Sequence, residues 1–214
     1  MDEDIAIINS NTRSQRIKDF FTKNKKLLIS ILIFLILILL SFYSYQIYQD
    51  KNKIKISNKY NSAIIKHKNG DNSRIVSAMQ EIVENKDPTY SPLALYYLID
   101  NELVSDKNKI NSLFDILINK TSLDSEIKYL IIYKKALYNA DTINEVQILE
   151  ILNPLINSKS VWKSHALYLI AEYFYSKGEK QKSKEFFSQI ITLENANLDI
   201  LKETQKRLNR DLSE

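Results

Sequence analysis

Residues 94–99 have the sequence ALYYLI, and residues 166–171 have the related sequence ALYLIA, 72 positions further along. A third apolar stretch, LIIY at residues 130–133, lies about halfway between them. The period is therefore about 36 residues, enough for two short helices and their connecting turns. Because one helix pair cannot bury its apolar face alone, this period predicts neighbouring pairs that stack on one another.

Apolar residues after position 50 recur at helical spacing and predict helices separated by short polar stretches. Ser91 followed by Pro92 predicts a helix start, Gly70 and Gly178 predict turns, and Pro154 predicts a kinked or shortened helix. The expected helices are 52–68, 73–86, 92–105, 108–120, 124–140, 143–157, 161–177, 180–194 and 197–211. They form four pairs, at 52–87, 88–123, 124–159 and 160–195, and a closing helix that is polar on most faces.

The last pair matches the tetratricopeptide pattern best, whereas the earlier pairs keep the period but lose the characteristic residues. Small Ala171 permits close helix approach, and Gly178 makes the turn between the two helices. The other matching residues are Phe174, Phe187 and Ile190, while Ser183 stands where the pattern usually has alanine.

No charged residue occurs between Lys26 and Asp50, where the sequence is LLISILIFLILILLSFYSYQIYQ. As a helix this run would extend about 34 Å, enough to cross a hydrocarbon core of about 30 Å. It is too long for a signal-peptide apolar region and no small-residue cleavage site follows it, so we expect an uncleaved anchor. The sequence therefore predicts an all-α fold: one N-terminal transmembrane helix, then a tetratricopeptide-like α-solenoid of about four helix pairs with a C-terminal capping helix.

We expect three parts: a short basic cytoplasmic tail (1–26), the transmembrane helix (27–49) and a periplasmic helical repeat domain (50–214). The tail carries six basic and four acidic residues. Basic residues also follow the span, but short segments weigh more than long domains in setting orientation, which favours a cytoplasmic N-terminus.

The composition argues against several functional classes. The chain has no cysteine, two glycines and two histidines, too few for thiolate metal sites, phosphate-binding loops or zinc-binding histidine motifs. Its formal net charge is +4, of which the residues after the tail hold only +2, so a nucleic-acid surface is not expected. We expect no catalysis, no cofactor, no metal and no small-molecule substrate.

The candidate partner-binding residues lie on the first helix of each pair, the helix that lines the concave groove in tetratricopeptide arrays. In the last pair they are His165, Tyr168, Glu172 and Tyr175; the equivalent positions 72 residues earlier are Tyr96 and Asp100, with Tyr133 nearby in the third pair. Tyrosine and charged side chains on a concave surface suit peptide recognition. Equally, the tyrosines could cap the packing between pairs; the sequence favours neither.

The whole chain resembles the bacterial YfgM-like family, also described as ancillary SecYEG translocon subunits. The resemblance rests on the basic N-terminus, the single span with aromatic residues at its outer end, and the degenerate helix pairs. Its most family-like part is VWKSHA at residues 161–166, leading into Ala171, Gly178 and Phe187. It implies an inner-membrane protein with a periplasmic repeat domain that contacts Sec translocon subunits, a periplasmic folding factor and exported client chains.

Two other classes remain open at this point. One is a structural docking subunit of a different bacterial envelope complex, such as division or cell-wall machinery. The other is an enzyme or an adaptor that faces the cytoplasm.

Overall fold

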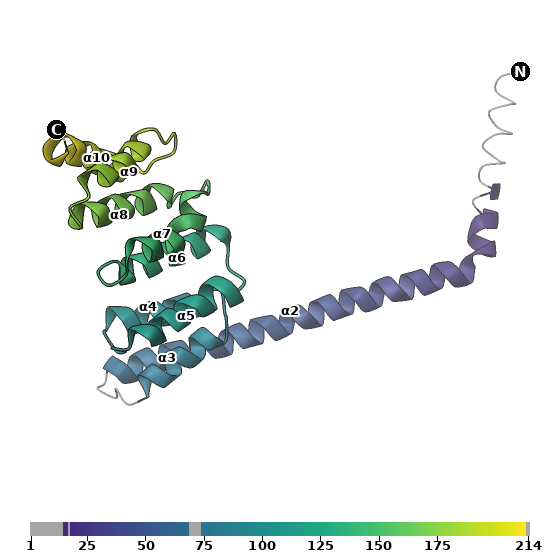
Figure 1. Ribbon diagram of the computed structural model, residues 1–214. Helices are drawn as coiled ribbons and strands as arrows, with labels where there is room; N and C mark the ends of the chain where they lie inside the picture. Colours follow the sequence, from purple (N-terminus) through teal and green to yellow (C-terminus); the bar gives the residue numbers. More distant parts are fainter. Residues whose placement is uncertain (1–14, 17, 69–73, 213–214) are drawn as a thin grey trace, which may run out of the picture. The chain divides into compact units, whose positions relative to one another are not determined.

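A computed structural model describes residues 15–16, 18–68 and 74–212, which are mostly α-helical and contain no β-strand (Figure 1). The all-α prediction is therefore confirmed. The helices are α2 (Lys25–Lys68), α3 (Ile75–Glu84), α4 (Tyr90–Asp100), α5 (Lys107–Lys120), α6 (Ser125–Asn139), α7 (Glu145–Ile156), α8 (Lys163–Ser176), α9 (Lys180–Ile191) and α10 (Leu198–Asp211).

The chain divides into two compact units, Met1–Lys55 and Ile56–Glu214. Helix α2 begins in the first unit and ends in the second, and it is the one helix among the described residues that is long and apolar enough to cross a membrane. None of its most apolar stretch is buried within the protein. Exposed aliphatic side chains over this length are unfavourable in water and are accommodated by a lipid bilayer.

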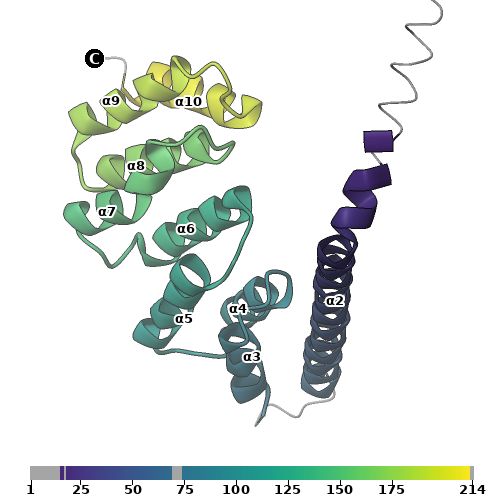
Figure 2. The ribbon, with the colours of Figure 1, turned by 90° about the vertical axis from the view of Figure 1, so that its right-hand side faces the viewer.

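In the second unit, helices α3 to α10 follow one another in a stack, as Figures 1 and 2 show. The buried side chains form three apolar clusters in chain order, the first reaching Ile131, the second running from Ile132 to Phe174, and the third ending at Leu212. Half-buried residues connect them: Ile118 packs on the first two, while Ile156 and Phe186 pack on the last two. The clusters thus form one continuous core, the arrangement that stacking of helix pairs requires.

Polar contacts between successive parts of the stack repeat at the spacing found in the sequence. The hydroxyl of Ser160 donates to Glu126 Oε2 at 2.7 Å, across 34 positions. The backbone N–H of Asn197 donates to Ser164 Oγ at 3.2 Å, across 33 positions. Lys182 Nζ donates to Glu145 Oε1 at 2.8 Å, across 37 positions. Corresponding elements of successive pairs therefore lie side by side.

Side-chain caps set several helix starts. Asp106, Asp124 and Asn197 each accept hydrogen bonds from backbone N–H groups in the first turn, and Asn144 forms a capping box with Gln147. Gly178 adopts a φ of 79°, which few other residues tolerate, and makes the turn between α8 and α9 as expected. Gly70 lies outside the described residues.

The start of α4 differs from the prediction. The helix begins at Tyr90, and Asp87 Oδ1 accepts hydrogen bonds from the N–H groups of Thr89 and Tyr90 at 2.9 and 2.7 Å. Ser91 does not cap the helix: its buried hydroxyl donates to the carbonyl of Ile82 in α3 at 2.7 Å. Pro92 consequently lies in the helix rather than at its first position.

The tetratricopeptide positions of the last pair are buried as their pattern predicts. Ala171, Phe174, Phe187 and Ile190 are at most 1% exposed. Ser183 is also fully buried, and its hydroxyl has no hydrogen-bond partner among the described residues. A buried unpaired hydroxyl opposes folding, which explains why alanine is usual at this position.

We predict that Ser183→Ala raises the free energy of unfolding of the full chain by about 1 kcal/mol, because it removes this unpaired group. Urea denaturation in detergent measures the change. Ser188→Ala is the matched control, since Ser188 is exposed on the same helix and bonds the carbonyl of Lys184. A loss of stability in Ser183→Ala would mean that the hydroxyl is paired.

Candidate partner-binding surface

The predicted row of binding residues lies on the first helices of three pairs. Tyr96 and Asp100 belong to α4, and Tyr133 belongs to α6. The remaining four are on α8: His165, Tyr168, Glu172 and Tyr175. Apart from Asp100, which is exposed, all of them are half-buried.

Tyr96 contacts the next helix pair through the ammonium group of Lys134. Lys134 Nζ of α6 lies 4.8 Å from the centre of its ring, a cation–π distance. The hydroxyl of Tyr96 is buried and has no hydrogen-bond partner among the described residues. Burial raises the pKa of this hydroxyl well above its usual value, and the nearby carboxylate of Asp100 adds to the effect.

Tyr133 and His165 form an aromatic cluster with Trp162, the N-cap residue of α8. The rings of Tyr133 and Trp162 are stacked with centroids 6.2 Å apart, and His165 packs edge-on against Tyr133 at 5.9 Å. Burial raises the pKa of Tyr133 and lowers the pKa of His165. Nδ1 of His165 is buried and lacks a partner within the described part of the chain.

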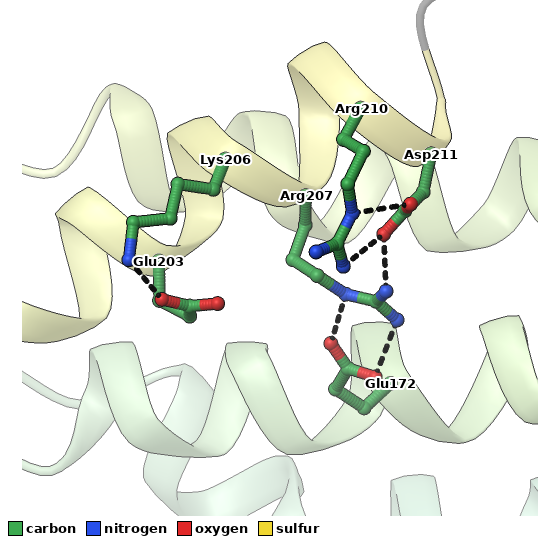
Figure 3. Close-up of polar contacts among 6 residues, drawn as sticks. All are labelled: Glu172, Glu203, Lys206, Arg207, Arg210 and Asp211. Carbon is green, nitrogen blue, oxygen red and sulfur yellow. Dashed lines mark hydrogen bonds and ion pairs between the residues drawn. The ribbon is translucent and has the colours of Figure 1, made fainter.

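Glu172 and Tyr175 are engaged by the closing helix α10. Arg207 donates from Nε to Glu172 Oε1 at 2.6 Å and from Nη2 to Glu172 Oε2 at 2.7 Å (Figure 3). Its guanidinium carbon lies 4.2 Å from the centre of the Tyr175 ring. Hydrogen bonding to Glu172 raises the pKa of Arg207, and Arg207 also pairs with Asp211 within α10.

Tyr168 packs edge-on against Phe187 of α9, with ring centroids 5.4 Å apart. Burial and the neighbouring Glu172 carboxylate raise the pKa of Tyr168 to about 12. With Glu172 and Tyr175, it forms the part of the row that contacts the end of the stack.

The row therefore has two parts. Helix α10 contacts Glu172 and Tyr175 through Arg207. Among the described residues it makes no ion pair or ring contact with the other part of the row, which consists of Tyr96, Asp100, Tyr133 and His165. As a binding surface the whole row stays a prediction. The described residues contain no group of three or more potential metal-ligating side chains.

Three residues that the sequence analysis missed complete this surface: Trp162, Lys134 and Arg207. Trp162 is the one tryptophan of the chain and lies one helical turn before His165, so its spacing could have placed it in the row. Lys134 and Arg207 gave no such signal, because each contacts a residue on a different helix.

The family model described as tetratricopeptide repeat-like domain matches residues 18–112. The chain contains a tetratricopeptide repeat-like domain. The match spans the described parts of α2, α3 and α4 and the start of α5, so it includes pairs in which the characteristic residues are weakest. No curated protein and no solved structure shows a significant match.

We predict that Arg207→Ala lowers the free energy of unfolding by about 2 kcal/mol, because it leaves the half-buried Glu172 carboxylate unpaired. Hydrogen exchange of α10 should accelerate in the same variant. Arg210→Ala is the control: this side chain is 69% exposed and pairs with Asp211, so its loss should change stability much less than the loss of Arg207. Equal effects of the two substitutions would contradict the assigned role of Arg207.

The half-buried ring of His165 predicts a pH dependence of stability. Its pKa is lower in the folded protein than the usual value of about 6.5, so the unfolded chain binds the proton more readily. Stability should therefore be retained above about pH 6.5 and decrease as the pH falls below it.

Melting temperatures of the full chain between about pH 8 and pH 5.5 measure this slope. His165→Phe should flatten it, because phenylalanine fills the site without titrating. An unchanged slope in this variant would assign the pH dependence to other groups.

Proposed function

We propose that this chain is a membrane-anchored protein-interaction scaffold of the bacterial inner membrane. Residues 1–26 are cytoplasmic, residues 27–49 cross the membrane and residues 50–214 form a periplasmic helical repeat domain. The observation that carries the proposal is the combination of one helix able to cross a membrane with a tetratricopeptide repeat-like domain. Solenoids of helix pairs provide extended binding surfaces, and such repeats typically serve protein partners rather than catalysis.

The chemistry of the row supports polypeptide partners. Tyr96, Tyr133 and Trp162 offer ring surface with few rotatable bonds, and Asp100 is an exposed charge that can orient a bound segment. The unpaired Tyr96 hydroxyl and His165 Nδ1 lie within the same surface. Anchoring raises the effective concentration of the surface near other membrane proteins, so individually weak contacts suffice.

Within this class we propose association with the Sec translocon. The architecture of this chain resembles that of the YfgM-like family. This resemblance implies Sec subunits, a periplasmic folding factor and exported client chains as partners. In this account the scaffold assists folding, or hand-over to a chaperone, as a client leaves the channel. A structural docking subunit of a division or cell-wall complex is the second candidate, because the same stacked helices would suit subunit contacts.

Photo-crosslinking in intact membranes tests the proposal. A photoreactive amino acid replaces Asp100, which is exposed on a first helix, and in a matched control it replaces Gln189, which is exposed on a second helix. We predict light-dependent adducts with translocon subunits or a periplasmic folding factor from position 100, at several times the yield from position 189.

Adducts with division or cell-wall proteins instead would favour the docking subunit. Equal yields from both positions, or none from either, would contradict recognition by the row.

A further inference from the structure

A groove of about 550 Å³ lies between α5, α6 and α7. Isoleucine side chains from each of these helices line it: Ile118 and Ile151, which are half-buried, and Ile132, which is buried. Its polar lining includes Asp115, Asn119, Lys135 and Glu150. The groove therefore combines an apolar surface with carboxylate and amide groups.

This groove and the predicted row of binding residues lie on different faces of α6. Tyr133 belongs to the row, whereas Lys135 lines the groove. Residues two positions apart are about 200° apart around an α-helix, so the two side chains point to nearly opposite sides. A ligand in the groove would leave the row accessible.

One wall of the groove is held in place by side-chain amides. Asn111 Nδ2 donates to Asn139 Oδ1 at 2.9 Å, and Asn139 Nδ2 donates to Asn111 Oδ1 at 2.8 Å. Asn139 also donates to the carbonyl of Lys135 at 2.7 Å. Because these groups satisfy one another, the wall is formed before any ligand binds.

The electrostatics of the groove favour a cation. Lys135 Nζ donates to Asp115 Oδ1 at 2.7 Å, so the one ammonium that lines the groove is already paired. Glu150 is exposed, and its carboxylate makes no ion pair within the described part of the chain. Pro154 also lines the groove and has no N–H, so it cannot donate the helical hydrogen bond to the Glu150 carbonyl. The Glu150 carboxylate therefore remains available to pair with a cation in the groove.

We propose that the α5–α7 groove binds an extended segment of a partner polypeptide in which a lysine or arginine lies between aliphatic residues. The aliphatic side chains pack on Ile118 and Ile151, and the basic group pairs with Glu150. The amide of Asn119, which makes no hydrogen bond among the described residues, is placed to bond the backbone of the segment. This inference rests on the proposed function, since it names a second surface through which the scaffold holds a polypeptide.

The test uses the full chain in nanodiscs of phosphatidylcholine and three fluorescein-labelled peptides. Each peptide has glycine–serine flanks and a core in which leucine alternates with lysine, glutamate or glutamine. Fluorescence anisotropy, corrected for empty nanodiscs, measures affinity. We predict that the lysine peptide binds about tenfold more tightly than the glutamate peptide, with the glutamine peptide between them.

Glu150→Lys should remove this preference and weaken binding of the lysine peptide about tenfold, and Glu150→Gln should have a smaller effect in the same direction. Glu84→Lys is the matched control, because Glu84 is an exposed glutamate on α3. Circular dichroism checks that each variant is folded. Equal affinity for the three peptides, or the same loss in Glu84→Lys as in Glu150→Lys, would overturn the proposal.

The outcomes separate this inference from the proposed function. Selective peptide binding without crosslinks from position 100 would support the groove and contradict the row as a recognition surface. Crosslinks from position 100 with no charge preference among the peptides would support the scaffold and overturn the groove.

Discussion

Burial of apolar surface between successive helix pairs is the constraint on which the unit Ile56–Glu214 depends. No pair encloses its own core, so each apolar cluster is completed by residues of the next pair, and Ile118, Ile156 and Phe186 each pack on two clusters. The two ends of the stack have no further pair to cover them. At one end Ile56 and Ala63 of α2 complete the first cluster; at the other, α10 covers the last pair with one face and presents charged residues on the rest.

This constraint also determines what the first helices of the pairs can offer to a partner. Where α10 covers α8, Arg207 donates a hydrogen bond to Glu172 and lies over the Tyr175 ring. For Tyr175 this contact is the packing role that was the alternative to partner binding. Nearer the middle of the stack, Asp100 remains exposed, and Tyr96, Tyr133 and Trp162 keep part of their rings accessible. The opposite side of α6 carries the amide-lined groove. A stack of this kind can thus present surfaces of different chemistry on its two sides.

Much of the fold follows from the sequence, because one signal is repeated. Apolar spacing located α3 and α5 to α10 within three residues at each end, whereas α4 ends five residues earlier than expected. The turn at Gly178 and the burial of Ala171 and Phe174 follow from local requirements. The start of α4 was predicted wrongly because Ser91 next to Pro92 resembles a helix cap. The Ser91 hydroxyl instead donates a hydrogen bond to the backbone carbonyl of Ile82. The contacts of Arg207 with Glu172 and of Lys134 with Tyr96 join separate helices, so no local pattern encodes them.

The proposal that most needs a test is the orientation, with residues 1–26 and residues 50–214 on opposite sides of the membrane. Because the chain contains no cysteine, single cysteines introduced by Ser10→Cys and Asp100→Cys report on each side separately. Intact spheroplasts treated with a membrane-impermeant maleimide should be labelled at position 100, and at position 10 only after lysis. Labelling at position 10 in intact spheroplasts, with position 100 protected until lysis, would contradict the account.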